Sequence, residues 1–207
     1  MTVEVSRIYL LDVATGASID AELRDGIEQE QLDDWRTKWQ PALAVVLQEL
    51  AGRGVPISQW PQSWHWNWDQ KSARVQGLLS YRGLCVVAQG ETQGLAQIDL
   101  TKSCQESRQA GRPLVYLDYL EVAPWNRREI QRPTRFRGVG TALLSAAVQL
   151  SLDEGFKGRL GLHSLPQADD FYRGMGMTDL GPDSNYQGLR YFEMTADHAR
   201  AFLDEED

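Results

Sequence analysis

The turn Arg135-Phe136-Arg137-Gly138-Val139-Gly140 opens a predicted helix whose apolar residues follow one stripe. A helix N-terminus exposes backbone N–H groups that lack partners, and it carries the positive end of the helix dipole. Gly138 and Gly140 let the backbone approach an anion closely, while Arg135 and Arg137 add positive charge. The stretch therefore predicts a phosphate-binding turn at the start of a helix.

The same turn also fits a plain helix start, because glycines before a helix often serve only a tight turn. It is not the phosphate loop of nucleotide hydrolases, since no Gly-Lys-Ser or Gly-Lys-Thr follows. It is not a complete dinucleotide fingerprint, which needs three glycines and a later acidic residue. The elements on either side of the turn decide between these interpretations.

The N-terminal side of the turn holds most of the predicted sheet. Apolar and alternating patterns predict strands over 5–11, 77–88, 94–100 and 114–122. Residues 89–93 between the second and third of these predict a hairpin turn. Apolar spacings of three and four predict a helix over 27–50, and Pro41 within it predicts a kink or a break into two helices.

The C-terminal side of the turn continues as strand and helix in alternation. The long helix ends at Gly155, and the remaining predicted elements are a buried strand over 159–165, a short helix over 168–173, a strand over 189–194 and a tail helix after Thr195. Antiparallel strands followed by strand, helix, strand, helix and strand indicate a mixed α/β (α+β) sheet.

Three motifs in this order resemble the GNAT superfamily of N-acyltransferases. They are Leu120-Glu121-Val122-Ala123-Pro124 at the end of a central strand, the glycine turn, and Phe171-Tyr172 before Gly174-Met175-Gly176-Met177. The resemblance implies a mostly antiparallel central sheet with splayed central strands and flanking helices. It also implies a single domain over 1–207, with acceptor-side elements over 5–75, the hairpin and coenzyme-binding core over 76–194, and a tail over 195–207.

The resemblance implies acetyl-CoA as co-substrate, with no metal. Backbone groups of the central strand would bind the pantetheine arm, and the Val122 N–H is a candidate donor to the oxyanion. Tyr172 occupies the position of the family's general acid, although Phe171-Tyr172 also fits simple core packing. The residues implied to bind the coenzyme are Leu120, Val122, Arg135, Phe136, Arg137, Gly138, Val139, Gly140 and Thr141.

The base that deprotonates the amine stays open between several groups. Asp118 and Glu121 are the carboxylates of the apolar strand, where burial can raise a carboxyl pKa toward the working pH. They project to opposite faces unless a bulge intervenes, and Glu121 lies nearer the expected acyl group. An ordered water chain is a further alternative. His163 is a weaker candidate, because a lone strand histidine is more often a structural hydrogen-bonding group.

The chain departs from the family pattern in two places. The link Trp125–Thr134 is longer than usual and holds Arg127, Arg128 and Arg132, which could line the phosphates, line the acceptor entrance or form a solvated basic loop. Leu165 stands where many members have an asparagine, so a neighbour such as Ser164 or Gln167 would supply that polar contact.

The acceptor side is dominated by tryptophan between Trp60 and Trp68. These rings could bind a cationic or apolar acceptor, pack as a lid on the core, or form an oligomer contact such as a homodimer interface. His65 and Asp69 could pair if the stretch is helical.

Composition sets the remaining bounds. The net charge of −8 argues against a nucleic-acid partner and is compatible with a cationic acceptor. Two cysteines indicate neither a disulfide framework nor a zinc site. No signal peptide or run of about 20 apolar residues is seen, so a cytoplasmic location without membrane contact is expected.

The leading hypothesis is an enzyme that transfers acetyl from acetyl-CoA to an amine of a small molecule or a protein. One alternative is a GNAT-fold module that binds the coenzyme or a partner without turnover. Another is a toxin-like acyltransferase acting on aminoacyl-tRNA, against which the negative charge counts.

Overall fold

The computed structural model describes residues 4–204, so residues 205–207 of the predicted tail lie outside it. Within this range the strands form one mixed sheet in the order β6-β1-β2-β3-β4-β5-β7-β9-β8. Every strand pairing with a described register is antiparallel except that of β5 with β7. The mixed, mostly antiparallel sheet predicted from the sequence is confirmed.

The described chain divides into two compact units. The first contains the residues up to Ala96 together with Leu120–Leu143, and the second contains Gln97–Tyr119 and the chain from Leu144 onward. Three elements pass through both units: β4 (Glu91–Asp99), β5 (Val115–Val122) and α4 (Val139–Asp153). The single domain predicted over 1–207 stays a prediction.

The first unit begins with a hairpin that the sequence analysis found only in part. β1 (Val5–Asp12) was predicted, but β2 (Ser18–Asp25) was not, and the two pair antiparallel along their whole length. Ile19, Ala21 and Leu23 alternate with polar residues in β2, so a signal with a period of two was present. β2 then pairs with β3 (Tyr81–Ala88).

The helical region of the first unit passes Pro41 without a break. α1 (Gln29–Asp34) leads into a π-helical turn at Trp35–Trp39, and α2 (Gln40–Gly52) follows directly. Pro41 lies at the start of α2, where its missing N–H costs least. The wide turn takes the place of the predicted kink or break, and it buries Trp35 and Trp39.

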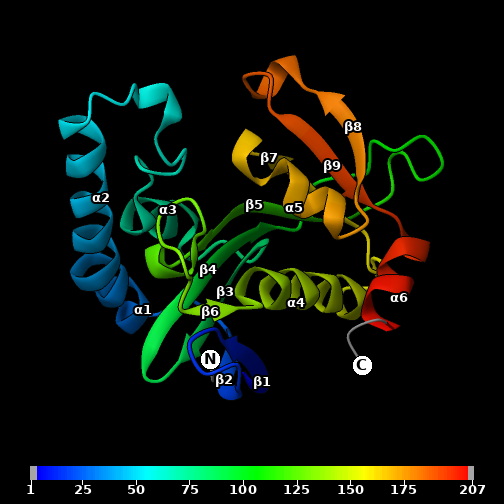
Figure 1. The fold of residues 1–207 in the computed structure, drawn as a ribbon. Helices are drawn as coiled ribbons and strands as arrows, with labels where there is room; N and C mark the ends of the chain where they lie inside the picture. Colours follow the sequence, from blue (N-terminus) through cyan, green and yellow to red (C-terminus); the bar gives the residue numbers. More distant parts are fainter. Residues whose placement is uncertain (1–3, 205–207) are drawn as a thin grey trace. The chain divides into compact units, whose positions relative to one another are not determined.

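Figure 1 shows α1 and α2 of the first unit in blue, and two shorter connections complete this unit. A short 3-10 turn at Ile57–Gln59 precedes α3 (Trp68–Val75). β3 and β4 are joined by the two residues Gln89 and Gly90, whose φ angles are 54° and 72°. The predicted turn over 89–93 was too long, because two left-handed residues suffice for a tight hairpin.

The second unit is built on β7 (Leu160–Ser164), β9 (Arg190–Met194) and β8 (Thr178–Pro182), of which β8 was not predicted. Its helices are α5 (Asp169–Gly174) and α6 (Ala196–Asp204). Single-turn 3-10 segments occur at Pro166–Ala168 and Ser184–Tyr186.

The parallel pairing of β5 with β7 is very short. Only Val115↔Leu160 and Tyr116↔Gly161 are in register, although β5 continues to Val122 and β7 to Ser164. The two strands therefore part after two residue pairs. This agrees with the splayed central strands predicted from the sequence.

Candidate active site

Glu121 is a buried carboxylate near the end of β5, with 7% of its surface exposed. Ser63 Oγ donates to Glu121 Oε1 at 2.5 Å, and Trp68 Nε1 donates to Glu121 Oε2 at 2.7 Å. Trp68 is fully buried and Ser63 is 4% exposed. Both carboxylate oxygens are thus held by donors from the tryptophan-rich stretch.

A third donor to Glu121 comes from the insert Trp125–Thr134. Arg127 Nη1 lies 3.4 Å from Glu121 Oε1 and 2.8 Å from Ser63 Oγ. Arg127 Nε donates to Glu129 Oε1 at 2.8 Å, and only 10% of the arginine side chain is exposed. Arg127 therefore faces the protein interior. We call Glu121, Ser63, Trp68 and Arg127 the carboxylate cluster.

The pKa of Glu121 is raised, because burial disfavours its charged form. The hydrogen bonds from Ser63 and Trp68 and the charge of Arg127 act in the opposite direction. Indole and guanidinium nitrogens only donate, so these contacts favour the carboxylate over the carboxylic acid. Burial therefore raises the pKa of Glu121, while the hydrogen bonds and the arginine charge limit that rise. A carboxylate that accepts a proton efficiently needs a raised pKa of this kind.

The predicted phosphate turn lies at the edge of the sheet and at the start of α4. Phe136–Arg137 forms the short strand β6, which pairs with the end of β1. Gly138 has a φ angle of 97°, a conformation that suits glycine. The first helical bond runs from Ala142 N to Gly138 O at 2.8 Å. The N–H groups of Val139 and Gly140 therefore have no acceptor within the helix, as an anion site requires.

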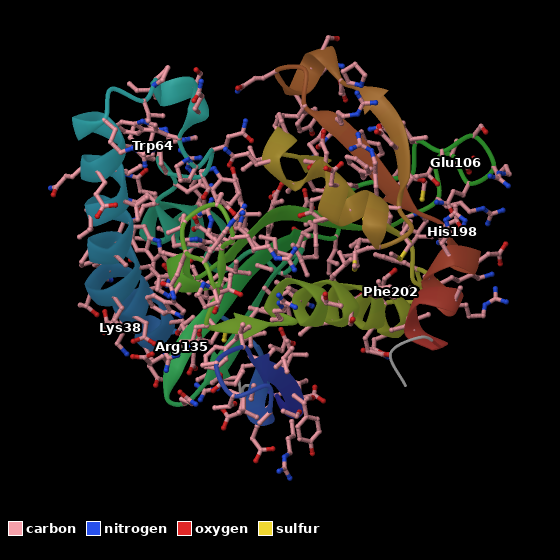
Figure 2. The ribbon with its side chains drawn as sticks, in the orientation of Figure 1. Lys38, Trp64, Glu106, Arg135, His198 and Phe202 are labelled. Atoms are coloured by element: carbon pink, nitrogen blue, oxygen red, sulfur yellow. The ribbon has the colours of Figure 1, made fainter. Side chains whose placement is uncertain are left out.

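The two arginines of the turn differ in their surroundings. Arg135 Nη1 lies 2.7 Å from Glu91 Oε2, and its Nη2 donates to Gln89 Oε1 at 2.7 Å. Lys38 Nζ lies 3.4 Å from Glu91 Oε1, so Lys38 and Arg135, labelled in Figure 2, share one carboxylate. Arg137 is exposed. Of the two, Arg137 is the one without a carboxylate partner in the described chain.

Other members of the turn serve the fold. Phe136 is 1% exposed, and its N–H donates to Asn126 Oδ1 at 2.9 Å. Gly94 on β4 lies under the start of α4: a Cβ there would come within 2.6 Å of Val139 Cγ1. The absence of a side chain at Gly94 thus lets the helix start pack directly on the sheet. The predicted coenzyme roles of Phe136, Val139 and Thr141 stay predictions.

Tyr172 belongs to the second unit and lies on α5. It is 7% exposed, and burial raises its pKa. Its ring packs edge-on against Phe171, with centroids 5.1 Å apart, and lies 5.9 Å from that of Phe192. The described residues supply no hydrogen bond to the Tyr172 hydroxyl. The side chain is therefore core packing that keeps a phenol proton at neutral pH, and its role as an acid stays a prediction.

His163 lies in a hydrogen-bonded chain within the second unit. Its Nδ1 is 2.6 Å from the Tyr116 hydroxyl and its Nε2 is 3.2 Å from Asp183 Oδ2. The ring stacks on Tyr186 at a centroid distance of 3.7 Å. Both ring nitrogens are therefore engaged, as in the structural interpretation of this histidine.

Asp118 is partly buried on β5, on the face of that strand that also carries Tyr116.

The tryptophan-rich stretch is folded onto its own unit. Trp60 Nε1 donates to Val55 O at 3.0 Å, and the rings of Trp60 and Trp64 meet edge-on with centroids 5.7 Å apart. The predicted pairing of His65 with Asp69 does not form, because α3 begins only at Trp68. Asp69 instead pairs with Arg36 in the π-helical turn Trp35–Trp39, at 2.9 Å.

Sequence reasoning found Glu121 but missed its three partners. Ser63 and Trp68 are 58 and 53 residues away along the chain, so no local pattern could relate them to it. Arg127 was noted within the insert, but as a phosphate, entrance or solvated residue. The one general signal was that a carboxylate on a buried strand needs hydrogen-bond donors, which does not say where along the chain they lie.

Within residues 4–204, no group of three or more His, Cys, Asp or Glu side chains is placed to hold a metal ion. The helices in that range are all too short or too polar to cross a membrane.

Comparison with known proteins supports the fold. No family model matches the chain, and no curated protein sequence matches it significantly. Among solved structures, the GNAT domain of S. lividans PAT matches with a TM-score of 0.55 at 15% identity, covering 92% of this chain and 96% of that one. The PaiA N-acetyltransferase from Thermoplasma acidophilum, in complex with coenzyme A, matches with a TM-score of 0.52 at 14% identity, covering 94% and 99%.

A mutant AtaT toxin bound to the C-terminus of the antitoxin AtaR and acetyl-CoA also matches, at 15% identity and a TM-score of 0.46, covering 63% of this chain and 78% of that one. That score is too low to support a statement about this chain. The first two likenesses establish the GNAT fold predicted from the sequence. At these identities they do not extend to the activity.

Proposed function

We propose that this chain, which has the fold of the two acetyltransferase structures above, transfers an acetyl group from acetyl-CoA to an amine. The observation that carries the proposal is the parting of β5 from β7 after two residue pairs. Beyond that point the β5 backbone is released from β7 and can hydrogen-bond an extended arm such as pantetheine. Leu120, Glu121 and Val122 follow the last of these pairs along β5.

The turn at 135–140 fits the pyrophosphate of the coenzyme. Val139 and Gly140 have N–H groups at a helix N-terminus, and Gly138, with a φ of 97°, has no side chain that would keep an anion from the backbone. Arg137 adds an exposed positive charge. Arg135 contributes charge to the same turn, in part offset by Glu91. The coenzyme would supply the acetyl thioester, whose carbonyl carbon is the electrophile.

The chemistry needs a proton acceptor for the amine, a donor for the oxyanion and an acid for the leaving thiolate. We assign the first to Glu121, which is buried, raised in pKa and located on the released part of β5. Asp118 is the alternative acceptor. The Val122 N–H would stabilise the oxyanion, and Tyr172, whose pKa is raised by burial, would protonate the thiolate.

The acceptor is a primary amine, carried by a small molecule or a protein. Glu121 and the net charge of −8 both favour a cationic group over an anionic one. Nucleic acid is disfavoured on the same ground. A homodimer remains compatible with the tryptophan-rich stretch, whose Trp64 is 38% exposed.

The test combines coenzyme binding with an amine screen. Saturating acetyl-CoA should raise the melting temperature of the protein, and labelled acetyl-CoA should acetylate at least one member of a panel of small amines and lysine peptides. Tyr172→Phe should reduce turnover by about 10²–10⁴-fold with little change in coenzyme affinity. Tyr9→Phe on β1, which is 62% exposed, is the matched control and should leave turnover unchanged.

Each failure has a distinct meaning. An absence of any thermal shift would exclude an acetyl-CoA enzyme. Binding without transfer to any amine would indicate a non-catalytic module instead. Unchanged turnover in Tyr172→Phe would remove that residue from the mechanism while leaving the activity in place.

A further inference from the structure

Three separate stretches of the first unit meet at Glu121. The tryptophan-rich stretch supplies Ser63 and Trp68, β5 supplies the carboxylate, and the insert supplies Arg127. Arg127 also bonds Ser63 directly at 2.8 Å, so it joins the insert to the tryptophan-rich stretch beside the carboxylate. An arginine in a solvated basic loop would not be 90% covered and held by three acceptors.

We propose that Arg127 is a positioning residue of the active site, which keeps the Glu121 carboxylate ionised and fixed so that it can take the proton of the acceptor amine. The insert then contributes a residue to the site. The catalytic meaning of this inference rests on the function proposed above, but the effect of Arg127 on Glu121 does not.

The charges around Glu121 support this role. Burial opposes ionisation of the carboxyl, and the positive groups that counter it are Arg127 and Lys71. Lys71 Nζ lies 4.5 Å from the centre of the Trp66 ring, whereas Arg127 Nη1 lies 3.4 Å from the carboxylate itself. Arg127 Nε pairs with Glu129, whose side chain is 43% exposed. Among the described residues, Glu129 is the only charged group besides Glu121 that Arg127 contacts. Arg127 thus lies in direct contact with Glu121.

The step that Arg127 serves can be written in full. The ammonium of the acceptor gives one proton to Glu121, which leaves a neutral amine and a carboxylic acid. The nitrogen lone pair then forms the C–N bond to the acetyl carbon, and the C–S bond breaks. The thiolate takes a proton from Tyr172, the nitrogen of the new amide returns its surplus proton to the Tyr172 phenolate, and Glu121 releases its proton to solvent. Without Arg127 burial would be less opposed, so the pKa of the carboxyl would rise further and less of the carboxylate would be available for the first transfer.

Trp68 provides a readout that does not depend on activity. Its indole N–H donates to Glu121 at 2.7 Å, so its NMR signal should move when the carboxyl titrates. Trp68→Phe assigns that signal among the seven tryptophans of the chain. Arg127→Gln should move the titration midpoint up by about 1–3 pH units, because a neighbouring arginine lowers a carboxyl pKa by about that amount.

The pH–rate profile provides the catalytic readout. The acid limb of kcat/KM should move upward in Arg127→Gln by the same number of units, so that activity lost at neutral pH returns at higher pH. Arg127→Lys keeps the charge and should give an intermediate midpoint, and it serves as the second variant if Arg127→Gln does not fold. Arg128→Gln changes an exposed arginine of the same insert and should leave both readouts in place.

Two results would overturn the inference. An indole midpoint that is the same in wild type, Arg127→Gln and Arg127→Lys would show that Arg127 does not set the ionisation of Glu121. A uniform loss of rate at every pH, without movement of the acid limb, would show that Arg127 is only structural. Failure of the wild-type protein to acetylate any amine would count against the proposed function alone, since the indole titration would still report on Arg127.

Discussion

Two buried polar clusters in this protein solve the same problem in different ways. In the first unit, the carboxylate cluster buries a charge, Glu121, and surrounds it with three donors. In the second unit, the chain from Tyr116 through His163 to Asp183 buries neutral groups and leaves its carboxylate, 18% exposed, at one end. The first arrangement depends on compensating a charge, and the second on pairing each hydrogen-bonding atom.

The difference shows in the protonation of the two central groups. Since a carboxylate only accepts, His163 Nε2 carries the ring proton and Nδ1 accepts from the Tyr116 hydroxyl. Burial lowers the pKa of His163 and keeps it neutral, with Asp183 opposing, whereas burial raises the pKa of Glu121. A compensated charge is the costlier arrangement to maintain, and it is typical of sites that move protons.

The largest expected effect is at Trp68, because it combines packing with the hydrogen bond to Glu121. Trp68 is fully buried, so Trp68→Ala should lower the free energy of unfolding by about 3–5 kcal/mol. Trp68→Phe keeps most of the ring and should cost about 1–3 kcal/mol, the price of leaving one carboxylate oxygen short of a donor. Urea unfolding of the three proteins measures both values. Equal losses for the two variants would mean that the hydrogen bond, not the packing, dominates.

The change in the second cluster should cost about as much as Trp68→Phe and less than Trp68→Ala. Tyr116→Phe removes the hydroxyl that donates to His163 Nδ1 at 2.6 Å and leaves the ring in place. The buried acceptor is then unpaired, at a cost of about 1–3 kcal/mol in the free energy of unfolding. A loss as large as that of Trp68→Ala would contradict the expectation that the buried neutral groups of this cluster cost less free energy than the buried charge of Glu121.

The two clusters should also give opposite pH dependences of stability. The folded protein holds the Glu121 proton more tightly than the unfolded chain does, so this group's contribution to stability falls as the pH rises from 4.5 to the raised folded pKa. For His163 the folded pKa lies below 6.5, so stability is lost as the pH falls from 6.5 toward the folded pKa. Denaturant unfolding at several pH values, compared with Glu121→Gln and His163→Gln, separates the two. Slopes of the same sign would refute the contrast.

The smallest effect is expected at the exposed end of the second cluster. Asp183→Asn keeps one oxygen, which can accept from the Asn185 N–H as Asp183 Oδ1 does at 2.9 Å. It places an amide NH2 against His163 Nε2, which can accept from it in the other imidazole tautomer. The loss in unfolding free energy should therefore be smaller than that of Tyr116→Phe, as for other partly exposed pairs. A larger loss would show that the charge of Asp183, and not its hydrogen bonds, is what stabilises that cluster.

The contrast also explains what the sequence could predict. Local signals located β1, β3, β5, β7 and the helix start after Gly138, because strand alternation and helix capping are properties of neighbouring residues. β2 was open to the same reasoning through Ile19, Ala21 and Leu23, and it was overlooked. The turn at Gln89 and Gly90 was drawn too long, since strand pairing extended β4 into polar residues.

The partners of Glu121 could not be predicted in the same way. Their meeting depends on where the tryptophan-rich stretch and the insert return to β5, and tertiary packing sets this. The pairing of Arg135 with Glu91 likewise joins residues 44 positions apart. Residue type suggested which groups could act at the site, but only the folded chain shows which of them are already occupied.

The insert has one more consequence, which concerns how its length can vary. Its ends are fastened to each other and to β4: Arg135 N donates to Trp125 O at 2.9 Å, and Asn126 donates to Gln93 Oε1 at 2.9 Å while accepting from Phe136 N. A loop closed at its base can gain or lose residues at its tip at little entropic cost. The insert could thus vary in length between its closed ends, provided that Ile130 and Gln131, whose N–H groups donate to Arg127 O, are kept.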